Sequence, residues 1–188
     1  MTRPTTVATH TFIAHVEDKP GVLNRISSLF RRRGFNIESL TVGHTETPGI
    51  SRMTFVVLTD QAGAERFAAH LYKLVNVISV ADITARPAVF RELAMIKVTA
   101  PQERRPEIVH LVDVFRARIV DLAPDSLTIE ITGHEDKIDG LVDVLRPYGL
   151  IEMARTGRLA MTRAPRSQAA AVTRPATDSH DPQVSYSV

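Results

Sequence analysis

The loop Glu17-Asp18-Lys19-Pro20-Gly21 holds the groups of this sequence that are best suited to bind a small charged molecule. An alternating apolar segment precedes it and an amphipathic segment follows, so it joins a strand to the first turn of a helix. The free backbone N–H groups and the positive dipole end of such a turn favour a carboxylate or a phosphate. Gly21 allows the bound group to approach the backbone closely.

The same loop also has a purely structural interpretation, which the sequence leaves open. Asp18 is of a residue type that caps helices, and Pro20-Gly21 is common turn chemistry. Under that interpretation the acid stabilises the helix start and binds no ligand.

The sequence carries no pattern that indicates catalysis or a metal site. Its seven His residues form no i, i+4 pair and no HExxH motif, and it has no Cys, no GxSxG and no P-loop. We therefore expect no catalytic residue, no metal and no cofactor in this chain. No apolar run approaches the roughly 18 residues of a membrane span. The absence of Cys and of a recognisable leader favours a cytoplasmic protein.

A formal charge of +2 does not require nucleic acid as a partner. The triplet Arg31-Arg32-Arg33 nevertheless ends the first predicted helix, and Arg25 adds a fourth positive charge without an acid nearby. These cations either complement the helix dipole and stay solvated or form a patch that steers an acidic partner surface.

Hydrophobic periodicity predicts the same order of elements twice, β-α-β-β-α-β. The elements of the first half are a strand at 11–16, a helix at 22–33, strands at 37–45 and 50–58, a helix at 67–75 and a strand at 77–84. Those of the second half are a strand at 92–99, a helix that Pro106 opens and whose apolar stripe runs over 108–115, strands at 118–122 and 127–132, a helix at 138–145 and a strand at 151–161.

This order predicts an α+β protein with two consecutive ferredoxin-like units, each an antiparallel sheet with helices on one face. We place the units at residues 9–86 and 87–164, between a flexible arm at 1–8 and a disordered tail at 165–188. Each unit has unpaired strand edges and one sheet face that its own helices leave bare. We therefore expect at least a homodimer.

Three stretches, VEDKPGVL at 16–23, RGFNIESLTVG at 33–43 and SRMT at 51–54, closely resemble the regulatory (small) subunits of acetolactate synthase, also called acetohydroxyacid synthase. The resemblance covers about residues 10 to 163. The D-x-P-G loop alone would indicate only an ACT domain, a broad class of amino-acid sensors, whereas the other two stretches are more specific.

The resemblance implies a feedback subunit of branched-chain amino acid biosynthesis. Its ACT units would pair, bind a branched-chain amino acid, chiefly valine, in the dimer interface, and both activate and inhibit a separate catalytic subunit. Thiamine diphosphate, Mg and FAD would belong only to that catalytic subunit. This division agrees with the absence of catalytic motifs from the chain.

The residues that the resemblance and the loop chemistry assign to the amino acid are Asp18, Gly21, Val22, Leu23, Asn36 and Ile37. Backbone N–H groups at the helix start would take the carboxylate. Asp18 would accept protons from the ammonium, joined by the side-chain carbonyl of Asn36 from the second chain. Leu23, Ile37 and Leu40 would form the apolar wall. Many family members carry Asn at position 18, so the acid here is a departure that bears on affinity.

The second half has no D-x-P-G loop, because residues 100–106 open its first helix instead. We expect no valine there and assign this unit to dimer support and partner contact. Two alternatives to the feedback subunit remain: a free-standing ACT sensor that acts on another enzyme or on nucleic acid, and a stand-alone enzyme on the same fold.

Overall fold

The computed structural model describes residues 6–164. The predicted tail at 165–188, and all but the last three residues of the predicted arm at 1–8, lie outside the described residues.

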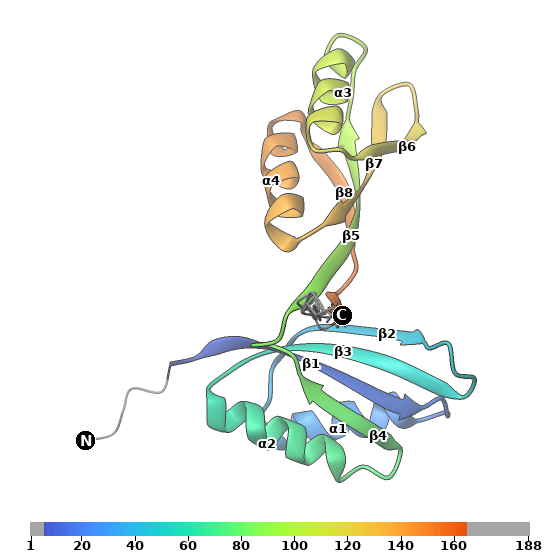
Figure 1. The fold of residues 1–188 in the computed structure, drawn as a ribbon. Coiled ribbons are helices and arrows are strands. Elements are labelled where there is room, and N and C mark those ends of the chain that lie inside the picture. The colour runs from blue at the N-terminus through green and yellow to red at the C-terminus, as the bar shows by residue number, and fades with distance from the viewer. Residues whose placement is uncertain (1–5, 165–188) are drawn as a thin grey trace, which may run out of the picture.

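The first unit has the predicted order of elements and the predicted antiparallel sheet. Its elements are β1 (Ala8–Glu17), α1 (Val22–Arg33), β2 (Ile37–His44), β3 (Ile50–Thr59), α2 (Gln61–Tyr72) and β4 (Val77–Asp82). The strands follow the order β2-β3-β1-β4, so β1 and β3 are central while β2 and β4 are edges. Both helices lie on one face of this sheet (Figure 1).

Helix α2 begins six residues before the first residue of the predicted helix. Its start is marked by a cap, because the Asp60 carboxylate accepts a hydrogen bond of 2.6 Å from the backbone N–H of Gly63. The apolar stripe does not include the first residues of α2, because Gln61 and Ala62 are exposed. Periodicity alone therefore misses it.

Four buried Phe side chains fill the space between the first sheet and its helices. The rings of Phe30 on α1 and Phe67 on α2 stack with their centroids 4.4 Å apart, and Phe12 and Phe55 contact Phe67 from the sheet side. Aromatic pairs at such distances contribute beyond their buried area. They hold α1, and with it the loop before it, firmly against β1.

The second unit repeats the plan with the strand order β6-β7-β5-β8. Its elements are β5 (Ala88–Thr99), α3 (Arg105–Val114), β6 (Arg118–Leu122), β7 (Ser126–Gly133), α4 (Glu135–Leu145), the short 3-10 helix η1 (Arg146–Tyr148), β8 (Leu150–Arg155) and β9 (Leu159–Thr162). Its core is aliphatic and lies between the sheet and its two helices.

The prediction of one closing strand at 151–161 is wrong. The chain leaves the ladder at residues 156–158, so that β8 pairs with Ala94–Val98 of β5 and β9 pairs with Ala88–Arg91 of the same long strand. The physical reason is a competing partner, because the backbone N–H of Arg158 donates to Ser39 Oγ of β2 at 2.9 Å.

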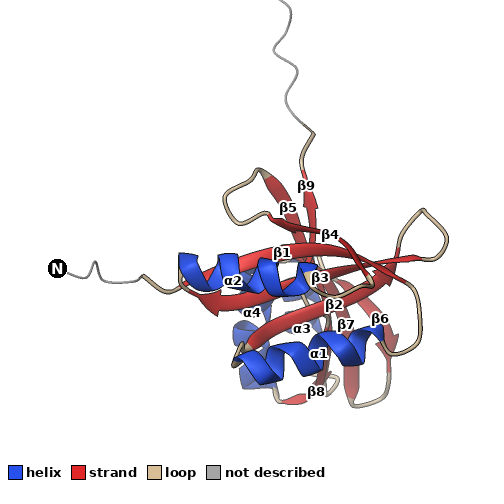
Figure 2. Cartoon of the chain, turned by 90° about the horizontal axis from the view of Figure 1, so that it is seen from below, coloured by secondary structure: helices blue, strands red, loops and turns tan. Residues whose placement is uncertain are grey.

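The long strand β5 and its partner β9 lie against the face of the first sheet that α1 and α2 leave bare. Ile13, Ile83 and Ala160 form a small buried cluster at this contact. Figure 1 shows the second unit rising from that face, and Figure 2 shows α1 and α2 on the opposite one. The chain itself thus covers part of the surface for which we expected a second copy. Within residues 6–164 there is no helix long and apolar enough to cross a membrane.

Candidate functional site

The loop between β1 and α1 has a glycine at the point where the helix begins. Gly21 is the N-cap residue, with φ of 84° in the left-handed region, and no side chain within residues 6–164 caps the helix. The interpretation of Asp18 as a helix cap is therefore wrong. Instead, Gly21 turns the chain into the helix and leaves the first turn open to solvent.

Two of the three expected backbone donors are free. Among the described residues, the N–H groups of Gly21 and Leu23 have no protein acceptor, whereas that of Val22 points to Lys19 O at 3.4 Å. The Val22 side chain is buried in the core, and the Leu23 side chain is 44% exposed. An anion at this helix start thus has two unoccupied donors and one weakly occupied donor, with an apolar side chain beside them.

Asp18 belongs to the same loop, three residues before Gly21, and its side chain is 46% exposed. Its backbone N–H donates to Gly49 O at 2.8 Å, which ties the loop to the β2–β3 turn. Its Oδ2 lies 3.3 Å from Nδ1 of His44, a residue that our sequence analysis did not assign to the site. The β2–β3–β1 register creates this neighbour, so no local sequence signal identifies it.

A hydrogen-bonded chain holds the loop from the other side. Asn76, just before β4, donates from Nδ2 to Glu17 Oε2 at 2.6 Å and accepts from Arg25 Nη1 of α1 at 2.6 Å. The hydrogen bond from Asn76, followed by the one from Lys19, lowers the pKa of Glu17 below its ordinary value of 4.5. These residues position the loop, and of them only Asn76 was missed at the level of sequence.

The structure does not bring Asn36 and Ile37 close to Asp18 within one chain. Ile37 is opposite Val57, which is opposite His10 near the start of β1, whereas Asp18 follows the end of that strand. Eight residues of strand at about 3.3 Å each separate the two ends by about 26 Å. Asn36 donates from Nδ2 to Glu38 Oε1 at 2.6 Å, and its side-chain carbonyl has no hydrogen-bond donor in the part of the chain that the structure describes. One small ligand cannot contact both groups in a single chain.

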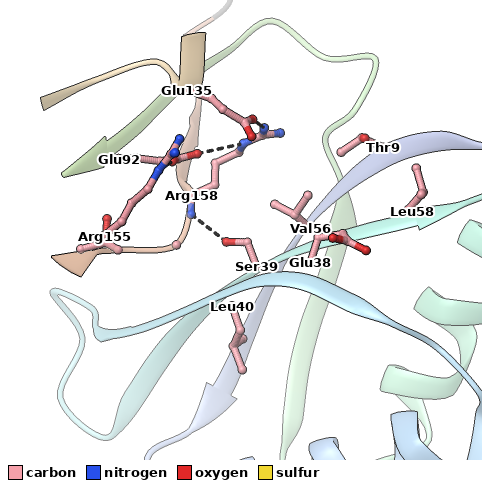
Figure 3. A pocket seen from close by; sticks show the side chains of 12 residues that line it. Thr9, Glu38, Ser39, Leu40, Val56, Leu58, Glu92, Glu135, Arg155 and Arg158 are labelled. Atoms are coloured by element: carbon pink, nitrogen blue, oxygen red, sulfur yellow. Dashed lines mark hydrogen bonds and ion pairs between the residues drawn. The ribbon is translucent and has the colours of Figure 1, made fainter. Parts of the chain in front are cut away.

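A cavity of about 580 Å³ lies between the two units (Figure 3), and the residues that line it do not include the Asp18 loop. It is lined on one side by β1, β2 and β3 and on the other by the 155–158 segment with Glu92 and Glu135. Arg155 and Arg158 already pair with carboxylates of the second unit, so their charge is compensated within the chain. The described residues contain no group of His, Asp and Glu arranged to hold a metal ion.

Two protein-family models match the chain. Residues 12–79 match the model of the AHAS small subunit-like ACT domain, and residues 91–164 match that of the small subunit of acetolactate synthase.

Full-length relatives are similar over most of the chain. A probable acetolactate synthase small subunit of Archaeoglobus fulgidus is 54% identical over 82% of this chain and 96% of its own length. The acetolactate synthase small subunit of Mycolicibacterium smegmatis is 49% identical over 87% of this chain and 96% of its own length.

A solved structure shares the arrangement of the two units. The crystal structure of the acetolactate synthase small subunit from Thermotoga maritima superposes with a TM-score of 0.79 at 40% identity, covering 84% of this chain and 99% of that one. Two matching family models, relatives near 50% identity and the shared fold agree with one another. The chain belongs to the family of acetolactate synthase small subunits.

Proposed function

We propose that this chain binds a branched-chain amino acid, chiefly valine, and thereby controls a separate catalytic subunit of acetolactate synthase. One observation carries the proposal: the loop that leads into an open helix start, whose N–H groups at Gly21 and Leu23 have no acceptor among the described residues, also carries the partly exposed Asp18 carboxylate. A free amino acid presents one negative and one positive group a few bonds apart. The donors suit the first and the acid suits the second.

A second copy of the chain completes this site. Strand β2 is an edge of the first sheet, so its outer hydrogen-bonding groups are available to another strand. In a two-fold pair, β2 runs antiparallel to its copy, and the start of one strand lies beside the end of the other. Asn36 of the partner subunit then comes to the His44 end of β2, where Asp18 lies. Asp18 and Asn36, which lie about 26 Å apart within one chain, would therefore lie close together between the two chains of the pair.

Selectivity for valine rests on the apolar wall. Leu23 is exposed beside the helix start, whereas Ile37 and Leu40 are partly buried against the first core. A difference of one methylene in such a wall supplies only about 1–3 kcal/mol, so leucine and isoleucine bind as well, with lower affinity.

Regulation follows because the ligand lies between chains. An effector that binds one arrangement of the two ACT units better than another shifts the population toward it, and a coupling of about 1–3 kcal/mol suffices for feedback inhibition. In this proposal the chain holds no cofactor and no catalytic group, and it activates the catalytic subunit by docking in the unliganded form.

Reconstitution tests the proposal. The purified chain is mixed with the catalytic subunit, and condensation of pyruvate is followed with and without valine. We expect stimulation by the chain and inhibition by valine only when the chain is present. Absence of both effects refutes the proposal, and stimulation without any valine effect refutes the effector assignment alone.

A further inference from the structure

The segment Thr156-Gly157-Arg158 is the point at which the second unit is bonded to strand β2 of the first. Its first residue still belongs to the second unit, because Thr156 exchanges hydrogen bonds with the backbone of Leu93 at 2.9 and 3.0 Å. Two residues later the backbone N–H of Arg158 donates to Ser39 Oγ at 2.9 Å. Figure 3 shows this bond crossing from one unit to the other.

The side chain of Arg158 bridges the same two units. Its Nη2 donates to Glu135 Oε2 at the start of α4 at 2.7 Å, and its Nη1 donates to Thr11 Oγ1 of β1 at 3.3 Å. Glu92 of β5 lies 3.8 Å from its Nε. The Arg158 side chain is only 18% exposed, so these interactions are less screened than those of a surface ion pair.

Gly157 brings the backbone of the second unit against β2. A Cβ at this position would lie 2.5 Å from Ser39 Oγ, 2.7 Å from Thr41 Oγ1 and 3.0 Å from the carbonyl oxygen of Leu40. Any side chain here would push the segment and β2 apart. The close approach is therefore possible because residue 157 is a glycine.

The surroundings of this contact leave room for movement. The cavity of about 580 Å³ lies directly beside it and is lined by Ser39, Leu40 and residues 155–158. The units are thus joined at this side by a few directed bonds across a hollow rather than by close apolar packing. Such a joint transmits a displacement of β2 to the residues bonded to it.

Strand β2 is also the strand that the proposed effector contacts. It starts at Ile37, directly after Asn36, and Asn36 is bonded to Glu38, the neighbour of Ser39. We infer that Gly157 and Arg158 form a latch that couples the effector-binding strand β2 to helix α4 of the second unit. This inference rests on the proposed function for the identity of the effector. The coupling between β2 and α4 is argued only from the contacts of Gly157 and Arg158.

Arg158→Gln is the variant that tests the latch, and Arg155→Gln is its matched control. Arg155 has a similar exposure of 23% and lines the same cavity, but its ion pairs, to Glu92 and Asp139, lie wholly within the second unit. Ser39→Ala provides a milder variant that removes only the acceptor of the Arg158 backbone N–H.

Spin labels measure the coupling directly. The sequence contains no Cys, so cysteines introduced at the exposed positions Ala69 of α2 and His110 of α3 carry a single pair of labels. The labelled chain is diluted with unlabelled chain so that distances within one copy are recorded. We expect Arg158→Gln and Ser39→Ala to broaden the distance distribution between the units and Arg155→Gln to leave it unchanged.

Effector binding and inhibition are measured on the same full-length proteins. Calorimetry should give an unchanged Kd for valine in Arg158→Gln, while valine inhibition of the reconstituted holoenzyme is reduced or lost. A merely structural role would not separate these two quantities.

The outcomes distinguish the latch from the effector assignment. Parent-like distances and inhibition in Arg158→Gln would overturn the latch, and so would equal effects of Arg155→Gln. If the parent chain binds no valine but Arg158→Gln still broadens the distribution, the proposed effector is wrong and the mechanical coupling holds.

Discussion

Nδ1 of His44 lies 3.3 Å from Oδ2 of Asp18, so a histidine faces the acid that we assign to the effector ammonium. Both side chains are substantially exposed, and His44 reaches Asp18 from the end of β2. The imidazole of His44 and the ammonium group of an amino acid compete for contact with the same carboxylate.

Replacing His44 should therefore change valine affinity in a predictable direction. His44→Ala removes the competitor and lowers the Kd, whereas His44→Arg holds a permanent positive charge at Asp18 and raises it. Exposed ion pairs contribute about 0.2–1 kcal/mol, so we expect changes of severalfold at most. Calorimetric titration measures both, with His110→Ala on the exposed face of α3 as the control. Equal Kd values for valine in the parent, His44→Ala and His44→Arg would show that His44 does not affect the site.

Asp18 itself should carry a larger share of the affinity. Hydrogen bonds to charged groups contribute about 1.5–3 kcal/mol, so Asp18→Ala should raise the Kd for valine by roughly tenfold to a hundredfold. Asp18→Asn keeps one acceptor oxygen and should lose less. Asp121→Asn, at an exposed position of β6, should have no effect. Unchanged affinity in Asp18→Ala would remove this residue from the site.

Gly21 should be sensitive to substitution because of its backbone and not because of crowding. Its φ is 84°, yet no atom lies within 4 Å of the position of a Cβ. Alanine in the left-handed region costs roughly 1–2 kcal/mol, so Gly21→Ala should lower the free energy of unfolding by about that amount. Gly43→Ala is the matched control, since it also has open space but no positive φ. Equal unfolding curves for the two variants would contradict this account.

The loop network should make stability depend on pH through Glu17. Its pKa is lowered in the folded protein by hydrogen bonds from Asn76 and Lys19, so the folded state favours the carboxylate. This contribution is present above the ordinary value of 4.5 and is lost as the pH falls through the lower folded pKa. Urea unfolding of the parent and Glu17→Gln across this range measures it. The parent should have the higher free energy of unfolding near neutral pH, and its advantage over Glu17→Gln should shrink on acidification. An advantage that does not change with pH would show that Glu17 ionisation is not its cause.

Local patterns were sufficient for most of the fold. Helix α1 has the predicted bounds, and both units have the predicted β-α-β-β-α-β order of elements, although the last strand of the second unit is divided into β8 and β9. The D-x-P-G loop was also identifiable, because the chemistry of a helix start depends on a few consecutive residues. Several boundaries were missed, among them the capped start of α2 and the break of the last strand at Gly157, where the competing bond partner is Ser39, more than one hundred residues away.

Proximity between distant residues could not be predicted in this way. Nothing near Asp18 in the chain indicates His44 or Asn76, and nothing near Asn36 indicates that it lies at the other end of the sheet. These relationships depend on strand register and on the direction in which each strand crosses the sheet, which are settled when the packed core selects one arrangement of all elements together. The composition of a loop is a local property of the chain, whereas its neighbours are a property of the folded whole.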